Sequence, residues 1–561
     1  MRREVSVVNK KVCSFPILFA LLALVIGTCA VVFPASAQAA PTSTGSITVS
    51  GTVASSYDAY QIFDANVIDG DNDAKIATDL AWASDAARDA VLPVLHSAGM
   101  PKSQTTAQEA AEWLNADSHL TSALSAQLAR SLQSSGAVSV ALNAGKTAEL
   151  PCGYWLIVAD DEAIAQNEAG TAPIMALVGG SAVTVKPKAA TPKVSKHVLE
   201  DSTAAWQKAA DATVTDDLYW RLSATVPAGL TAYDTYTVQF VDTMSAGLDP
   251  SKVAVSMRVY VAAGADGGFD AVSGDKDGRA GTEPAKGWTD ITALCRVSVD
   301  GKTFTARTGD LIAALGGADA FTAGARVVAV YNAPLNSACN HGIAKGNPNE
   351  VYLCYPRSPF ADQSGDAGFT RTPSDDACAY TWDLALTKRG SDGDKPLAGA
   401  VLSIADDRGR TLAADGTWDA EGKATITTGE DGRVTVSGVD SGKLEVRELK
   451  APKGYTAFEG TRSVKVKAEG LDVDQVVAAK PKLTITAESP LRADSADGST
   501  GSLEASIINT PTGTPPSITT GGFMPLTGDM AMYAVAAAAV AGAALIVVAL
   551  LIKRGGGSHK E

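Results

Sequence analysis

The sequence is poor in the residues on which many enzymes depend. Its 561 residues include 5 His, and none of the motifs HExxH, GxSxG or the Walker phosphate loop occurs in it. No basic stripe runs through its interior and the net charge is −15, which argues against nucleic acid as a partner, because phosphate binding needs clustered Lys and Arg. An ordinary soluble enzyme and a nucleic-acid-binding protein are therefore both disfavoured.

Charged residues are modest in number, at 19% of the chain against 45% hydrophobic residues. Such a composition can bury real cores, which excludes general disorder. A chain of 561 residues is too long for one ordinary domain and corresponds to three or four domains of roughly 150 residues each.

Residues 1–39 have the order of a secretory signal peptide. Basic residues up to Lys11 precede an apolar run over residues 13–33, and small residues follow over 35–39. A positively charged segment, an apolar segment and an A-x-A site in this order direct export, and the signal peptide is then cleaved off. The expected cleavage is after Ala37 or Ala39. The mature protein is therefore predicted to be secreted, with an uncleaved anchor as the less favoured alternative.

The other end contains an uninterrupted apolar stretch over residues 531–552. At 1.5 Å per residue it is about 33 Å long as a helix, enough to cross a bilayer core of roughly 30 Å. Lys553 and Arg554 follow at once, so the short tail is predicted to stay cytoplasmic. We therefore predict a C-terminal transmembrane helix.

A short motif precedes this stretch, after a Pro-, Gly- and Thr-rich linker over residues 512–523. Residues 524–561 contain the motif, the apolar span and the basic tail in this order. They resemble the LPxTG cell-wall sorting signal of Gram-positive surface proteins, except that the motif begins with Met in place of the usual Leu. In that family a sortase cysteine attacks the Thr carbonyl, and an amine resolves the thioester. The resemblance implies sortase and peptidoglycan as partners; a simple single-pass membrane protein is the alternative. The motif residues are Met524, Pro525, Leu526, Thr527 and Gly528.

Between the ends, short alternating runs are separated by turns. The runs at 47–49, 138–142 and 434–436 alternate with period two, and regularly spaced short strands favour β-sandwiches. From about residue 74 to 132 the chain is rich in Ala with Leu at helical spacing, so helices packed on the first sandwich are predicted there. Shifts in composition divide the chain into modules of residues 40–188, 189–378 and 379–511.

In the last module, polar residues stand where an apolar strand face should continue. Side chains two apart on a strand share a face, and the face of Leu384 and Leu386 continues with Lys388. By the same parity Glu448 and Asn509 each end an apolar face. All three polar side chains are therefore predicted to point into a core.

The middle module repeats this pattern. Lys196 shares a face with Val194 and Val198, and Asp242 shares a face with Phe240. Both charged groups are thus predicted to be buried.

A buried lysine, acid and asparagine can do more than pair. Desolvation penalises an uncompensated charge and favours the neutral amine and the neutral carboxylic acid. The neutral amine is a nucleophile, and the protonated acid can donate a hydrogen bond to the asparagine carbonyl and pass a proton to departing ammonia. The product would be an isopeptide cross-link, made once within each domain.

The last module resembles a Cna B-type domain with the pilin E-box, in residues 395–400, 428–434 and 444–455. This resemblance implies a bond between Lys388 and Asn509 with Glu448 as the catalytic acid. An ordinary buried salt bridge is the alternative.

The middle module resembles the isopeptide-forming fimbrial domain of major pilins, in residues 233–236, 241–248, 331–336 and 346–349. The resemblance implies a cross-link between Lys196 and Asn336 with Asp242 as the catalytic acid. Asn332 and Asn349 compete with Asn336, because a proline disturbs the strand parity there. A buried salt bridge is again the alternative.

The first module resembles the N-terminal pilin domain, in residues 57–63 and 150–156, and shows no such trio. In polymerising pilins a sortase joins the Thr carboxyl of one subunit to a lysine in a YPKN-like motif near this boundary. The counterpart here is Lys188, with Lys186 and Ala189 in place of Tyr and Asn. A solvated linker lysine is an equal alternative.

Cysteine and metal-binding patterns add little. Of 7 Cys, Cys13 and Cys29 leave with the signal, and the odd number that remains allows at most two disulfides and a free thiol. We predict one bridge, between Cys354 and Cys378, since the compartment permits oxidation. Residues 69–73 lack the Gly and Glu of a calcium loop and are predicted to form an acidic hairpin turn, so neither a metal nor a cofactor is expected.

The sequence thus predicts an all-β protein of tandem Ig-like β-sandwich domains, the first with inserted helices, plus the C-terminal transmembrane helix. The predicted function is that of a structural shaft subunit of a sortase-assembled pilus on a Gram-positive cell surface, with other pilin subunits as partners. Its only chemistry is the single-turnover self-reaction, so it is not predicted to be an enzyme. The alternatives are a monomeric wall-anchored adhesin with a host surface ligand, and a basal or minor pilin that uses the same domains as a stalk.

Overall fold

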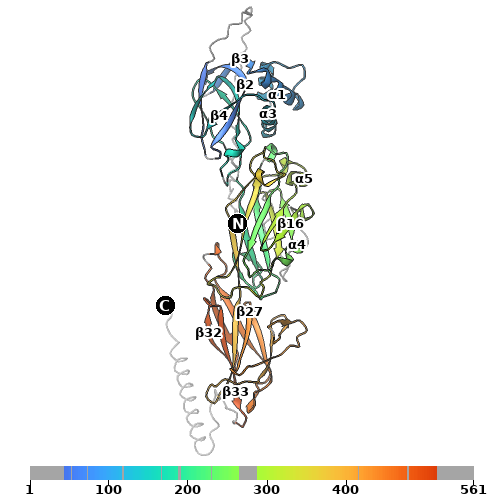
Figure 1. The fold of residues 1–561 in the computed structure, drawn as a ribbon, viewed down its shortest axis with the longest axis vertical. Helices are drawn as coiled ribbons and strands as arrows, with labels where there is room; N and C mark the ends of the chain where they lie inside the picture. Colours follow the sequence, from blue (N-terminus) through green and yellow to red (C-terminus); the bar gives the residue numbers. More distant parts are fainter. Residues whose placement is uncertain are drawn as a thin grey trace, which may run out of the picture.

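The structure, a computed structural model, describes residues 43–513 apart from 52, 72–73, 117–118, 166, 188–190, 229, 265–286, 415 and 477–478. Three bodies built mainly of β-strands follow one another along the long axis of the molecule (Figure 1). Among the described residues no helix is both long and apolar enough to span a bilayer. The predicted signal peptide, sorting motif and transmembrane helix, and Lys188, lie outside the described residues.

The first domain packs a three-stranded sheet (β5-β1-β8) against a five-stranded one (β3-β2-β6-β7, with β4 paired to β2). Three helices lie on one side of it (Figure 1). Each helix begins at a residue whose hydroxyl accepts a backbone N–H of the first turn, namely Ser84, Thr106 and Thr121. The elements are β1 (Thr44–Val49), β2 (Ser56–Asp69), β3 (Lys75–Trp82), α1 (Asp85–Ser97), α2 (Ala107–Asn115), α3 (Ser122–Ser134), β4 (Ser139–Asn143), β5 (Thr147–Pro151), β6 (Gly153–Ala159), β7 (Ile174–Val178) and β8 (Val183–Val185).

The helical segment begins later than the sequence pattern predicted. Residues 75–82 form β3, which pairs antiparallel with the second half of β2 and closes the hairpin expected at residues 69–73. The periodic leucines fit α3, where Leu124, Leu128 and Leu132 are all buried against the sheet. Pairing of β3 with β2 from Asp69–Lys75 to Phe63–Trp82 shows that strand formation prevailed over the Ala-rich composition there.

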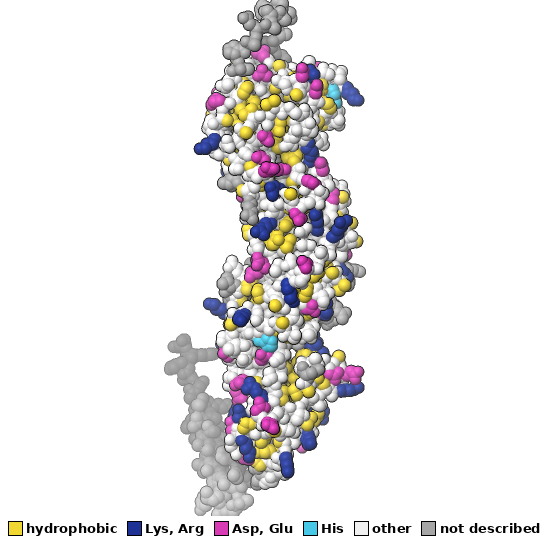
Figure 2. All heavy atoms as spheres, viewed as in Figure 1, with side chains coloured by type: hydrophobic (Ala, Val, Ile, Leu, Met, Phe, Trp, Pro, Cys, Tyr) yellow, Lys and Arg dark blue, Asp and Glu magenta, His cyan; other side chains and the backbone are white. Residues whose placement is uncertain are grey.

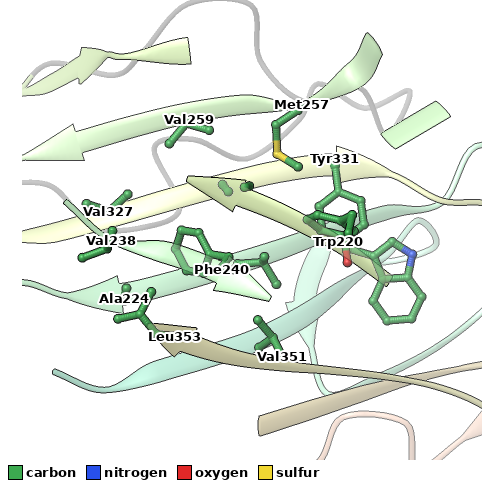
Figure 3. Close-up of a cluster of buried hydrophobic side chains, with 14 of the residues drawn as sticks. Trp220, Ala224, Val238, Phe240, Met257, Val259, Val327, Tyr331, Val351 and Leu353 are labelled. Atoms are coloured by element: carbon green, nitrogen blue, oxygen red, sulfur yellow. The ribbon is translucent and has the colours of Figure 1, made fainter. Parts of the chain in front are cut away.

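The second domain is a sandwich of a six-stranded and a seven-stranded sheet. Their orders are β10-β9-β12-β18-β14-β15 and β11-β21-β19-β13-β17-β16, with β20 added beside β19. One large apolar core fills the space between them (Figure 3). The elements are β9 (Val194–Glu200), β10 (Ala205–Gln207), β11 (Ala209–Asp211), β12 (Tyr219–Thr225), β13 (Gln239–Met244), α4 (Val253–Ser256), β14 (Arg258–Ala262), β15 (Trp288–Asp290), β16 (Arg296–Asp300), β17 (Thr303–Arg307), α5 (Leu311–Ala314), β18 (Arg326–Asn332), β19 (Asn347–Pro356), β20 (Phe369–Arg371) and β21 (Asp375–Tyr380).

The third domain is a sandwich in which the first and last strands are neighbours. The order β27-β22-β33-β29, with β32 beside β33, makes one sheet, and β25-β24-β23-β28-β30-β31, with β26 beside β23, makes the other. β22 and β33 run parallel. The elements are β22 (Trp382–Gly390), β23 (Val401–Ala405), β24 (Thr411–Leu412), β25 (Trp418–Asp419), β26 (Ile426–Thr427), β27 (Arg433–Val439), β28 (Gly442–Lys450), β29 (Tyr455–Thr456), β30 (Thr461–Glu469), β31 (Lys482–Ala487), β32 (Leu491–Asp497) and β33 (Ser502–Pro511).

The surface gives no hint of a large binding patch on the face that Figure 2 shows. Acidic and basic side chains are interspersed there along all three domains, and the hydrophobic side chains are scattered between them.

Polar contacts join the second and third domains. Asp211 Oδ2 accepts hydrogen bonds from Trp382 Nε1 at 2.6 Å and from Ser441 N at 3.0 Å. Arg410 Nη2 donates to Asp216 Oδ2 at 2.7 Å. Because these bonds cross the boundary and are largely shielded from solvent, they hold the two domains together.

The same junction should make stability depend on pH. Burial, followed by the nearby Asp211 carboxylate, raises the pKa of Glu200 to about 7, and burial also raises the pKa of Asp201 and Asp440. Between pH 4.5 and 7 the folded protein therefore binds more protons than the unfolded chain, so we expect stability to fall by about 2 kcal/mol as pH rises through this range. Urea unfolding from pH 4 to 8 measures the effect.

Glu200→Gln should flatten this pH dependence, because the side chain can no longer ionise. Glu350→Gln, an exposed change on β19, is the matched control and should keep the wild-type slope. Equal slopes in the two variants would contradict the assignment to Glu200.

Candidate functional site

Strand pairing brings the three polar residues of the third domain together. Lys388 lies on β22 and Asn509 on β33, and the parallel register sets Lys388 opposite Ile507 and Gly390 opposite Asn509. Since alternate residues share a face, Lys388 and Asn509 are diagonal neighbours on the inner face of one sheet. Glu448 lies on β28 of the opposite sheet and faces them.

The resulting cluster is tightly connected. Lys388 Nζ donates to Asn509 Oδ1 and lies 3.2 Å from Glu448 Oε1 and 3.3 Å from Glu448 Oε2. Asn509 Nδ2 donates to Glu448 Oε1 at 2.8 Å. Each member thus contacts the other two.

Solvent is excluded from this cluster. The side chains of Lys388 and Glu448 have an exposed fraction of 0%. Burial lowers the pKa of Lys388 to about 8, although Glu448 opposes the shift. A substantial fraction of the amine is therefore neutral near physiological pH, which is the nucleophilic form.

Phe458 completes the third-domain site, and the sequence analysis did not identify it. Its backbone N–H donates to Glu448 Oε2 at 3.1 Å, and its ring centroid lies 5.6 Å from Lys388 Nζ. The residue lies between β29 and β30 in no periodic pattern, so no sequence signal marked it.

The second domain holds an analogous cluster between its two sheets. Lys196 on β9 and Tyr331 on β18 come from one sheet, and Asp242 on β13 and Asn349 on β19 come from the other. Asn349 lies opposite Met244 in the antiparallel β13–β19 register, so it is a diagonal neighbour of Asp242 on the inner face. All four residues are completely buried.

Hydrogen bonds connect the four side chains. Lys196 Nζ donates to Asp242 Oδ2 and, at 2.8 Å, to Tyr331 Oη. Tyr331 donates to Asp242 Oδ2 at 3.0 Å, and Asn349 Nδ2 donates to Tyr331 Oη at 2.9 Å.

Two acceptors in this cluster lack a partner among the described residues, Asp242 Oδ1 and Asn349 Oδ1. Burial raises the pKa of Asp242 more than the nearby Lys196 lowers it. Burial likewise lowers the pKa of Lys196 to about 8. A proton on Asp242 would turn one of the two unpaired acceptors into a donor, so the cluster is better satisfied as neutral amine and neutral acid.

The asparagine beside this lysine cluster is Asn349, not Asn336, and the sequence-based assignment is corrected accordingly. Asn336 lies in the loop after β18, partly exposed, where its Nδ2 donates to Ala246 O and Leu248 O at 3.0 Å each. Asn332 is not in the cluster either, because its Oδ1 accepts from the Leu218 backbone N–H and its Nδ2 donates to Asp217 Oδ1. A sequence signal for Asn349 existed, because it lies on the inward face of β19, after Asn347 and before Val351 and Leu353.

The predicted disulfide between Cys354 and Cys378 is wrong. All five described cysteines are free. Cys378 lies opposite Pro348 on β19, six residues before Cys354. At about 3.4 Å per residue the two cysteines are roughly 20 Å apart along the strand, far beyond the reach of an S–S bond.

Part of the third domain is similar to a known family of domains. Residues 383–480 match the family model described as SpaA: Prealbumin-like fold domain. This range includes Lys388 and Glu448.

The chain is 30% identical over 134 residues to the trypsin-resistant surface T6 protein of Streptococcus pyogenes serotype M6. The alignment covers 22% of this chain and 23% of that protein, so the chain matches about a quarter of its relative. The relationship to pilin proteins predicted from the sequence is confirmed by this match and the family model.

Solved structures to which this chain shows similarity include three pilins. The T6 backbone pilin of S. pyogenes has 16% identity and a TM-score of 0.45, covering 84% of this chain and 98% of that one. The major pilin SpaD of Corynebacterium diphtheriae has 16% identity and a TM-score of 0.40 with the same coverages. The major pilin BcpA of Bacillus cereus has 11% identity and a TM-score of 0.37, covering 84% of this chain and 99% of that one.

Proposed function

We propose that this chain is a shaft subunit of a sortase-assembled pilus on a Gram-positive cell, and that its second and third domains each close a Lys–Asn isopeptide bond. The observation that carries the proposal is the recurrence of one buried lysine, acid and asparagine cluster in two successive sandwiches. The export signal, the sorting motif at residues 524–528 and the family match of the third domain support it.

The arrangement of the side chains supports the following reaction. The neutral lysine amine attacks Cγ of the asparagine; the Nζ–Cγ bond forms, the Cγ–Nδ2 bond breaks, and one proton passes from Nζ to Nδ2 so that ammonia leaves. In the second domain, where burial raises the pKa of Asp242, the protonated acid would donate a hydrogen bond to the developing oxyanion. Burial and fixed contact supply the orientation, so the reaction needs no cofactor and happens once.

The product would suit a force-bearing filament. A bond between Lys388 and Asn509 closes a loop that contains nearly all strands of the third domain. A force applied at the two ends of the domain would pass from β22 to β33 through this bond, so residues 389–508 would bear no load. A stalk built of such domains resists extension without relying on the hydrogen bonds of its sheets.

Polymerisation would use the sorting motif and a lysine of the neighbouring subunit. We expect wall extracts of the producing cell to give an SDS-resistant ladder of this protein, because each junction is a covalent amide. In a Lys188→Ala strain the ladder should collapse to monomer, with Lys186→Ala as the matched control. Immunoblotting after SDS gel electrophoresis measures both.

A single band in the wild-type extract would contradict the shaft role and favour the monomeric adhesin. A ladder that persists in the Lys188→Ala strain would reject Lys188 as the acceptor while leaving the shaft role intact.

A further inference from the structure

One hydroxyl in the second domain contacts all three members of the predicted cross-linking cluster. Tyr331 Oη accepts from Lys196 Nζ at 2.8 Å and from Asn349 Nδ2 at 2.9 Å, and it donates to Asp242 Oδ2 at 3.0 Å. A phenol has one proton to donate and two lone pairs that accept. Its hydrogen-bonding capacity is therefore fully used, and both nitrogens that take part in the reaction lie on the same oxygen.

In the third domain, a carboxylate oxygen of the acid contacts both nitrogens of the cluster. There Glu448 Oε1 lies 3.2 Å from Lys388 Nζ and accepts from Asn509 Nδ2 at 2.8 Å. One carboxylate oxygen thus contacts both the attacking and the departing nitrogen, and the acid alone can carry the proton between them.

The acid of the second domain is arranged differently. Asp242 is one methylene shorter than a glutamate, and its Oδ2 contacts Lys196 and Tyr331, while its Oδ1 has no partner among the described residues. The oxygen that contacts both nitrogens belongs to Tyr331 instead. A tyrosine hydroxyl therefore occupies the bridging role that the longer acid has in the third domain.

The position of Tyr331 is set by packing on all sides. It lies opposite Trp220 in the β12–β18 register, and the two rings sit together at one end of the core (Figure 3). Lys196 Nζ is 5.4 Å from both ring centroids, and Phe304 packs edge-on against Tyr331 with centroids 4.8 Å apart. Burial, with Asp242 beside it, raises the pKa of Tyr331 well above 10, so the hydroxyl keeps its proton at physiological pH.

We propose that Tyr331 is a catalytic residue of cross-link formation in the second domain, where its hydroxyl relays the proton from Lys196 Nζ to the departing Nδ2 of Asn349. The inference rests on the proposed isopeptide bond. As Nζ bonds to Cγ it gives a proton to Tyr331 Oη, while the proton of Tyr331 passes to Nδ2. The Cγ–Nδ2 bond then breaks, ammonia leaves, and both Tyr331 and Asp242 end in their initial protonation states.

The test is Tyr331→Phe in the full mature chain, made by cell-free synthesis and sampled over time. Tryptic mapping by mass spectrometry separates the linked peptide of Lys196 and Asn349 from that of Lys388 and Asn509. We expect the second-domain bond to form about a hundredfold more slowly, as for other general acid–base groups. The third-domain bond of the same molecules should form at the wild-type rate.

Tyr355→Phe is the matched control. Tyr355 is equally buried in the same core, and its hydroxyl makes no contact with Lys196, Asp242 or Asn349. It should leave both rates unchanged. Equal second-domain rates in the Tyr331 and Tyr355 variants would overturn the role of Tyr331 while the cross-link itself stands.

Wild-type protein that never forms the second-domain bond would overturn the proposed cross-link in that domain, and the relay with it. Thermal unfolding tests whether the Tyr331→Phe protein fails to cross-link only because its fold is lost. Asp242→Ala is the unlinked reference. An unlinked Tyr331→Phe protein that melts as cooperatively as this reference supports the relay. Loss of the cooperative transition would overturn it, because Tyr331 would then act through the fold.

Discussion

Glu448→Ala is expected to leave the third domain open while the second domain closes normally. The variant loses the carboxyl group that contacts both Lys388 Nζ and Asn509 Nδ2, so the group that would move the proton between the two nitrogens is gone. Intact-mass spectrometry of the mature protein should therefore show one retained ammonia relative to the wild type.

The stability of the third domain should fall strongly in the same variant. Lys388 and Asn509 are 121 residues apart in sequence, and by analogy with a disulfide a cross-link over such a loop is worth about 5 kcal/mol. For a domain of this size that corresponds to a decrease in Tm of roughly 15–25 °C, which differential scanning calorimetry resolves.

Glu445→Ala is the control for this experiment. Glu445 lies on the same strand, β28, but on the outer face, where it pairs with Lys443 near solvent. It should keep the wild-type mass and Tm within a few degrees. A Glu448→Ala protein with the fully cross-linked mass would refute the role of the acid.

Asn349→Ala is expected to abolish the cross-link of the second domain, and Asn336→Ala to keep it. Asn349 is the asparagine held in the buried cluster with Tyr331, Lys196 and Asp242, whereas the Asn336 amide bonds to carbonyls of a surface loop. Tryptic mapping should find the linked peptide in the Asn336 variant and miss it in the Asn349 variant.

The two asparagine variants should also differ in stability. Loss of the cross-link should cost about 5 kcal/mol in Asn349→Ala, while loss of the three side-chain hydrogen bonds of Asn336 in Asn336→Ala should cost about 2–3 kcal/mol. The reverse result, with the linked peptide lost only in Asn336→Ala, would contradict the placement of these residues.

Much of the candidate site could be predicted from local patterning. Alternation along a strand is a property of a few consecutive residues, and it predicted correctly that Lys196, Asp242, Lys388 and Asn509 point into cores. The same kind of pattern was present for Asn349 in β19, but Pro334 disturbed the strand parity before Asn336, and Asn332 and Asn349 competed with Asn336, so the choice stayed open.

Composition was a weaker guide than alternation. The Ala-rich stretch from residue 74 predicted helix, yet its first part pairs with β2 as β3, because a neighbouring strand was available to complete its hydrogen bonds. The prediction of a disulfide was wrong for a related reason. Two cysteines near one boundary in sequence were placed far apart along β19 by the register of β21.

The sequence by itself determined the class of fold and the inward direction of the polar side chains, since each depends on residues close together in the chain. Only the tertiary structure decided which asparagine lies in the cluster of Lys196, and that Tyr331 stands between them. Contacts between the two sheets of a sandwich depend on strand register and on how the sheets pack, and no local pattern encodes either of these.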